Sequence, residues 1–167
     1  SKLHIDVDRI DPVFQFPQTL KSLRLWVNDE SVNVLQLTPL TRLQNLEIDI
    51  EKDKDPIDLS TLTTLTWLDA NESPISLFPT SLVECTVWLG TDADLSSLTN
   101  LTWLSVCLEP NIRVTFPTGL KGLCVCAGKL DNTNVGEVAL ESVELWVQVT
   151  RDDLERLPKT LKKIDGG

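Results

Sequence analysis

Leu20-Lys-Ser-Leu23-Arg-Leu25-Trp-Val27 carries apolar residues at positions one, four, six and eight of an eight-residue unit. Successive side chains of a β-strand point to opposite faces of its sheet, so positions four, six and eight predict one buried face. Position one lies where the chain turns into the strand. The unit therefore predicts a β-strand with Leu23, Leu25 and Val27 facing a core and the intervening residues facing away from it.

The same unit recurs along essentially the whole chain. Further full units, in which Val, Ile, Cys or Ala replaces some of the leucines, begin at Leu43, Leu65, Leu82, Leu101, Leu120 and Leu140. Leu3, Ile5 and Val7 look like the end of an earlier unit, and Leu161 opens an eighth that the end of the chain truncates. Successive units begin 17 to 23 residues apart. One unit cannot bury its apolar edge alone, so neighbours about 4.8 Å apart must stack into a continuous core.

We therefore expect one curved parallel sheet of seven or more strands. The residues expected in its core are Leu23, Leu25, Leu46, Ile48, Leu68, Val87, Leu104, Val106, Leu123, Val125, Val143 and Leu145. Position eight of the sixth unit is Ala127, which the same alternation predicts to face the core. Antiparallel hairpins, or Trp26 and Trp88 in the core, would contradict this register.

Two kinds of segment lead from one strand to the next. Four units follow a Phe-Pro or Leu-Pro pair, in which Pro favours extended backbone and its neighbour fills the core: Phe16-Pro17, Phe78-Pro79, Phe116-Pro117 and Leu157-Pro158. Three other units follow leucines spaced three apart, on one side of a short helical or 3-10 turn: Leu37, Leu40 and Leu43; Leu59, Leu62 and Leu65; Leu95, Leu98 and Leu101. Units this short leave no room for a long helix opposite the sheet.

This pattern and its period resemble the leucine-rich-repeat family over essentially the whole chain. The Pro-containing units look like the LPxxL repeats of bacterial effectors, and the LxxLxxL units look like those of phosphatase-regulatory and internalin-type proteins. The resemblance implies a single α/β solenoid domain over residues 1–167, with about seven full repeats and partial units at both ends, as in a fragment of a longer protein. The family's Asn at position nine appears only as Asn28, which leaves the subfamily open.

All five tryptophans of the chain fall at positions three, five or seven, which face away from the core: Trp26, Trp67, Trp88, Trp103 and Trp146. Leucines alone define the register, so this coincidence is not built into it. Exposed aromatic residues mark binding surfaces, because they offer a large apolar area at low entropic cost. Shielding of the sheet, or stacking of the indoles on one another, is the structural alternative.

Acidic residues gather on the first half of the same surface: Glu47, Asp49, Asp69 and Glu84, with Arg24 as the one base. The chain as a whole has a net charge of −10, from 25 acidic and 15 basic residues. Such a charge repels nucleic acids and anionic membranes and suits a basic protein surface or peptide. A solvated charged face, or a calcium site that continues through Glu51, Asp53 and Asp55, is the alternative.

The four cysteines match no zinc-binding pattern and do not cluster near the ends of the chain. The register places Cys107, Cys124 and Cys126 on the exposed surface, where Cys107 and Cys126 share position seven on neighbouring strands and could bridge. We expect free thiols, with these three reactive and Cys85 protected, and a cytoplasmic protein. The sequon at Asn100 keeps an extracellular location open.

These observations favour a monomeric, non-catalytic module that binds a protein or peptide on a concave face, without cofactor or metal. Trp67, Trp88 and Trp103 are its expected central anchors, and the four carboxylates are expected to steer the partner. The single histidine, His4, has no nucleophile placed beside it. Carbohydrate binding on the same tryptophans is the alternative, and glycoside chemistry by Glu47, Asp69 and Glu84 is a further one.

Overall fold

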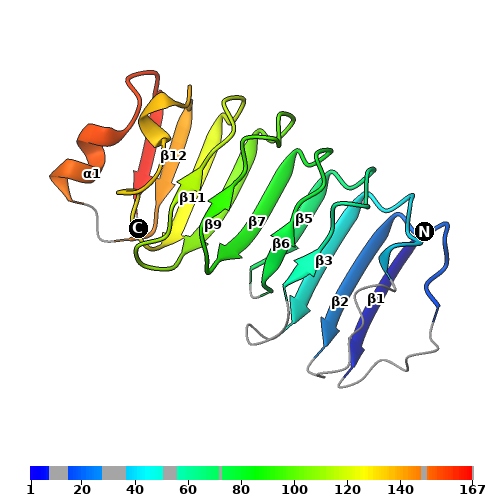
Figure 1. The fold of residues 1–167 in the computed structure, drawn as a ribbon. Helices are drawn as coiled ribbons and strands as arrows, with labels where there is room; N and C mark the ends of the chain where they lie inside the picture. The colour runs from blue at the N-terminus through cyan, green and yellow to red at the C-terminus, as the bar shows by residue number, and fades with distance from the viewer. Residues whose placement is uncertain (8–14, 28–36, 51–55, 72, 148–149, 167) are drawn as a thin grey trace.

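The protein is a parallel β-solenoid. The computed structural model describes residues 1–7, 15–27, 37–50, 56–71, 73–147 and 150–166, and its turns stack in chain order from the blue N-terminal end to the red C-terminal end (Figure 1). Nine of the strands form one sheet in the order β1-β2-β3-β5-β7-β9-β11-β12-β13. These strands are β1 (Lys2–Val7), β2 (Ser22–Val27), β3 (Asn45–Ile50), β5 (Trp67–Ala70), β7 (Glu84–Leu89), β9 (Trp103–Leu108), β11 (Gly122–Ala127), β12 (Ser142–Leu145) and β13 (Lys163–Gly166).

The strands pair in the register that the leucines predict. Position four lies beside position four in every turn, through Leu23, Leu46, Leu68, Cys85, Leu104, Leu123 and Val143. All pairings within this sheet are parallel. The prediction of one parallel sheet with seven or more strands is confirmed.

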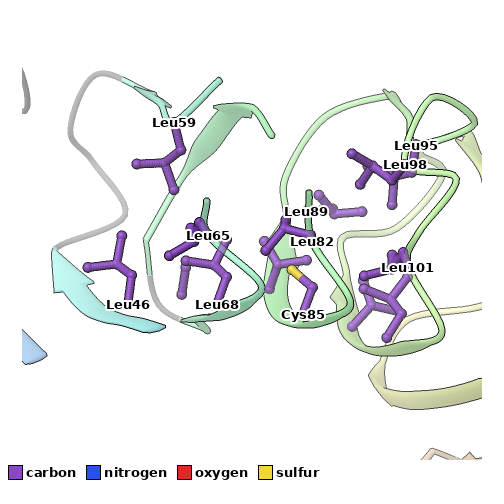
Figure 2. Close-up of a cluster of buried hydrophobic side chains, with 14 of the residues drawn as sticks. Leu46, Leu59, Leu65, Leu68, Leu82, Cys85, Leu89, Leu95, Leu98 and Leu101 are labelled. Atoms are coloured by element: carbon purple, nitrogen blue, oxygen red, sulfur yellow. The ribbon is translucent and has the colours of Figure 1, made fainter. Parts of the chain in front are cut away.

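The core lies between the sheet and the segments that connect its strands. All twelve side chains expected in the core are buried, with exposed fractions of 3% or less. Leucines of the strands and of the connecting segments point toward one another, as Figure 2 shows for Leu46, Leu59, Leu65 and Leu68. A buried Leu side chain contributes roughly 2 kcal/mol of hydrophobic stabilisation. Because a single turn cannot bury its leucines alone, each turn is stabilised mainly by contacts with its neighbours.

The connecting segments are turns and short strands rather than helices. Leucines spaced three apart form successive turns in which the N–H of one leucine donates to the carbonyl of the one before, as from Leu62 to Leu59 and from Leu65 to Leu62. Two small parallel sheets lie in these connecting segments: β4 (Ile57–Asp58) pairs with β6 (Ile75–Leu77), and β8 (Ala93–Asp94) pairs with β10 (Val114–Thr115). The expected α/β character is therefore weak, because turns and extended backbone close these short units.

Two short helices lie in the C-terminal third of the described ranges. A 3-10 helix, η2 (Val135–Glu137), precedes β12, and the α-helix α1 (Arg151–Arg156) precedes β13 (Figure 1). No helix in the described ranges has the length and apolar character needed to cross a membrane. Phe16, Phe116 and Leu157, each beside a Pro, are buried, and Phe78 is partly buried against the same core. These side chains fill the core as the sequence predicts.

A backbone ladder marks the start of each strand. The carbonyl of Gln44, for example, accepts hydrogen bonds from the N–H groups of both Thr66 and Trp67 in the next turn. The same bond pair recurs from turn to turn, from Ser1 at one end to Glu141 at the other. Because every turn repeats this junction, positions three and five of successive strands form continuous rows across the sheet.

Candidate binding face

We call the side of the nine-stranded sheet that carries positions three, five and seven the open face. Alternation is clear in β9, where Trp103, Ser105 and Cys107 are partly exposed and the intervening residues are buried. The position-three row contains Ser22, Asn45, Trp67, Glu84, Trp103, Gly122 and Ser142. The position-five row contains Arg24, Glu47, Asp69, Thr86, Ser105, Cys124 and Glu144.

The first strands of the open face carry an aromatic and ionic cluster. Arg24 Nε donates to Glu47 Oε2 at 2.6 Å, across β2 and β3. The Arg24 guanidinium carbon also lies 5.7 Å from the centre of the Trp26 ring. His4 meets the same ring edge to face, with centroids 5.7 Å apart. Arg24 therefore compensates the charge of one of the four predicted carboxylates and lies over the ring of one of the tryptophans.

An open groove of about 540 Å³ lies beside this cluster. It runs over β1, β2, β3 and the start of β5, and its lining includes Lys2, His4, Ser22, Arg24, Asn45, Glu47 and Trp67. Cationic and hydrogen-bonding side chains thus line this groove together with the Trp67 indole. Sequence reasoning missed Lys2, His4, Ser22 and Asn45 as groove residues, although β1 keeps the same register and places Lys2 and His4 in the position-three and position-five rows.

The middle of the open face is acidic. Strands β3, β5, β7, β9 and β11 contain no Lys or Arg. Asp69 lies between Glu47 and Thr86 in its row, and burial raises the pKa of its carboxyl group. A backbone hydrogen bond from Asn71 and the charge of Arg24 oppose that rise, whereas Glu47 and Asp49 add to it. A carboxylate in this setting is stabilised by an external cation.

Glu84 is flanked by two tryptophans in the position-three row. Trp67 of β5 pairs with Glu84 of β7, which in turn pairs with Trp103 of β9. The next residue along the row is Gly122, and the Trp103 ring occupies the space above it: a Cβ there would lie 2.0 Å from Cε3 and 2.3 Å from Cζ3. The missing side chain of Gly122 is therefore what admits the Trp103 indole at this place.

Trp88 lies apart from this pair. Its ring occupies the space above Gly90, where a Cβ would lie 2.4 Å from Cη2, and its Nε1 donates to Glu109 at 3.1 Å. It lines a second groove, of about 550 Å³, with Pro74, Leu77 and other residues of the connecting segments. Trp146 follows the end of β12 and is 64% exposed. The five tryptophans all avoid the core. Trp67 and Trp103 share the position-three row, and the other three occupy position seven, where the pairing of β3 with β5 and of β5 with β7 has ended.

The cysteines depart from the predicted arrangement. A bulge between Val125 and Ala127 shifts the register of β11 against β9, so that Cys107 pairs with Ala127 rather than with Cys126. Ala127, expected in the core, is exposed for the same reason. All four cysteines lie in the described ranges, and no disulfide links any two of them. Cys124 lies on the open face as expected but is only 6% exposed, so its predicted reactivity is not supported.

Cys85 is buried, as expected, and burial raises the pKa of its thiol. No group of three or more His, Cys, Asp or Glu side chains in the described ranges is arranged to hold a metal ion. The calcium alternative involved Glu51, Asp53 and Asp55, which lie outside the described residues.

No protein-family model matches the sequence, and no curated protein matches it. The architecture is that of a parallel β-solenoid with an acidic, tryptophan-bearing open face.

Proposed function

We propose that the chain is a binding module of the leucine-rich-repeat type, and that its open face takes a protein or peptide ligand carrying Lys or Arg side chains. The repeat period, the inward leucines and the parallel stacking support the repeat type. The observation that carries the choice of ligand is the row Trp67, Glu84 and Trp103 on β5, β7 and β9. A carboxylate whose two neighbours in the row are tryptophans can pair with a cationic head group, and an indole near it can contact the apolar stem.

The surrounding charges support the same ligand. Asp69 lies in the neighbouring row on β5, and its raised pKa means that its environment opposes an uncompensated negative charge. Glu47 already pairs with Arg24, so the unbalanced charge is centred on Asp69 and Glu84 rather than on the first strands. A basic ligand would bring the missing positive charge, and the net charge of −10 would accelerate its approach.

The test is a selection of random peptides displayed on phage against the immobilised wild-type protein, followed by affinity measurements on the synthetic peptides obtained. We expect peptides enriched in Lys and Arg. Trp67→Ala and Trp103→Ala should each raise the Kd about thirtyfold, which corresponds to about 2 kcal/mol. Glu84→Gln should slow association and weaken its dependence on salt.

Leu77→Ala is the matched control, because Leu77 is 53% exposed on β6, outside the row of Trp67, Glu84 and Trp103. It should leave the Kd unchanged. Selected peptides without basic enrichment, or an unchanged Kd in both tryptophan variants with a loss in Leu77→Ala, would contradict the proposal. Circular dichroism and thermal unfolding of every variant separate lost binding from lost folding.

Carbohydrate is the second candidate ligand, and the groove beside Trp67 is the observation that favours it. Its lining combines one indole with Ser22, Asn45 and charged side chains, and sugars are bound by stacking on an aromatic ring together with hydrogen bonds to polar groups. A glycan array distinguishes the two ligands. Glycan binding that Trp67→Ala abolishes, with no basic peptides selected, would replace the peptide proposal.

A further inference from the structure

Cys124 and Cys126 form a close pair of thiols on β11. Their Sγ atoms lie 3.8 Å apart, although one residue separates them in the chain. In a regular strand, side chains two residues apart are spaced by about 6.6 Å along the strand. The bulge between Val125 and Ala127 includes Cys126, and at this point β11 departs from the geometry of a regular strand. The local backbone therefore brings together two sulfurs that a regular strand would hold apart.

The two thiols differ in their access to solvent. Cys126 is exposed, whereas Cys124 is 6% exposed in its row between Ser105 and Glu144. Burial raises the pKa of the Cys124 thiol, a hydrogen bond with Ser105 opposes that rise, and the neighbouring Cys126 and Glu144 add to it. Ser105 Oγ lies 3.4 Å from Cys126 Sγ, and once Cys126 has lost its proton the serine is the partner that can donate a hydrogen bond. Cys126 is thus the thiol that meets a reagent first.

We propose that Cys124 and Cys126 are a peroxide-responsive dithiol that closes to a disulfide within β11. Cys126 acts as the attacking thiol and Cys124 as the resolving thiol. Accessible thiols next to a resolving cysteine are the ones that reversible oxidation selects. Cys124 lies two residues from Gly122, and the Trp103 ring occupies the space above that glycine. The proposed disulfide would therefore form on the open face, close to one of the two tryptophans of the proposed binding row.

The reaction balances with hydrogen peroxide as the only oxidant. The Cys126 thiolate attacks one peroxide oxygen, the O–O bond breaks, and the leaving hydroxide takes up a proton to become water. This leaves Cys126 as a sulfenic acid. Cys124 Sγ then attacks Cys126 Sγ, the S–O bond breaks, and the departing hydroxide takes the Cys124 proton to form a second water.

The other cysteines are poorly placed to compete. Cys107 pairs with Ala127 across the bulge, and its Sγ contacts Asn71 Oδ1 at 3.6 Å. Cys85 is buried in the core. A soft-metal site would need further ligands, and the described residues supply no cluster of three or more His, Cys, Asp or Glu around the pair. The Sγ–Sγ approach within β11 therefore favours an intrastrand disulfide.

Trypsin separates the possible products cleanly. Cleavage after Lys121 and Lys129 releases residues 122–129, which contain Cys124 and Cys126, whereas residues 55–113 contain Cys85 and Cys107. The native protein is treated with one equivalent of hydrogen peroxide, alkylated with iodoacetamide in denaturant, and digested without reductant. We expect peptide 122–129 to carry no alkyl group and to be two hydrogens lighter than its free dithiol form. Peptide 55–113 should be alkylated at both cysteines.

Three variants and one condition complete the test. Cys107→Ser should give the same intrapeptide disulfide. Cys124→Ser should stop at the sulfenic acid of Cys126, which dimedone traps, and Cys126→Ser should give neither product. A disulfide linking peptides 55–113 and 122–129, or sulfinic acid on Cys126 beside an alkylated Cys124, would overturn the proposal. So would closure at an equal or higher rate in the chain unfolded by guanidinium, because the bulge would then contribute nothing.

Discussion

Single side chains complete the hydrogen bonds that the sheet leaves open. Pairing between β3 and β5 stops at Glu47 and Asp69, so the backbone groups of Ile48 and Ile50 extend past the ladder. Ser73 satisfies both: its Oγ accepts from the Ile50 N–H at 2.8 Å and lies 3.2 Å from the Ile48 carbonyl, to which it donates. Its exposed fraction is 0%. A serine hydroxyl at position nine of the third unit thus completes backbone hydrogen bonds that the sheet leaves open.

Ser73→Ala should lower the free energy of unfolding by about 1 to 3 kcal/mol, because it leaves a buried N–H and a buried carbonyl without their partner. Urea unfolding followed by tryptophan fluorescence measures the change. Ser97→Ala is the control, since Ser97 is exposed in a connecting segment, and it should have little effect. Equal stability of the two variants would mean that water or backbone movement replaces the Ser73 hydroxyl.

At the scale of an element, α1 shows how local signals act within a repeat. Thr150 and Asp153 form a reciprocal cap: Thr150 Oγ1 accepts from the Asp153 N–H at 3.2 Å, and Asp153 Oδ2 accepts from the Thr150 N–H at 2.8 Å. Hydrogen bonds to its carboxylate from the Thr150 hydroxyl and from the Thr150 N–H hold the pKa of the Asp153 carboxyl below its usual range. No residue of α1 is buried, but the Arg156 side chain donates a hydrogen bond to the Asp131 carbonyl of the preceding turn. The helix therefore depends on its cap more than on packing.

Thr150→Ala should destabilise α1 by about 1 kcal/mol, because the cap is lost while the core is untouched. Amide hydrogen exchange in residues 151–156 should accelerate about fivefold, which is the rate equivalent of that free energy. Thr150→Ser retains the hydroxyl and should exchange at close to the wild-type rate. A global loss of protection across the β-strands in Thr150→Ala would show instead that the helix supports the whole stack.

At the scale of the whole molecule, the open face combines charges from several strands without burying them fully. Asp69 feels Glu47, Asp49 and Arg24 from the neighbouring strands in addition to its own partial burial. Its raised pKa means that the folded protein binds a proton at this carboxyl more tightly than the unfolded chain does. The ionised carboxylate therefore destabilises the fold, as is common where a site is reserved for a ligand.

Asp69→Asn should raise the free energy of unfolding at pH 7 and low salt, because it removes the charge while its amide oxygen can still accept from the Asn71 N–H. The advantage should shrink as the pH falls through the raised pKa. It should vanish below the ordinary value of 3.8, where Asp69 is protonated in both states. Denaturant unfolding across this pH range measures the difference. Glu137→Gln, which removes an exposed charge on η2, is the control, and a destabilised Asp69→Asn at pH 7 would contradict the assignment.

Most of the fold and part of the face could be read from the sequence. Apolar residues in a period of two define the strands, and their recurrence in every unit leaves only one register in which all of them are buried. That register places Trp67, Glu84 and Trp103 in one row before any coordinates are known. These properties depend on the local alternation of side chains and on repetition, both of which the sequence displays directly.

The tertiary structure decided what depends on contacts between turns that are about twenty residues apart in the chain. The bulge in β11 exposes Ala127, separates Cys107 from Cys126, and brings Cys126 close to Cys124. Space above glycines determines where the Trp88 and Trp103 rings lie, and the end of β5 determines which backbone groups Ser73 must satisfy. None of these follows from alternation, because each arises where a neighbouring turn departs from the repeat and a side chain occupies the space or the hydrogen bond that this leaves.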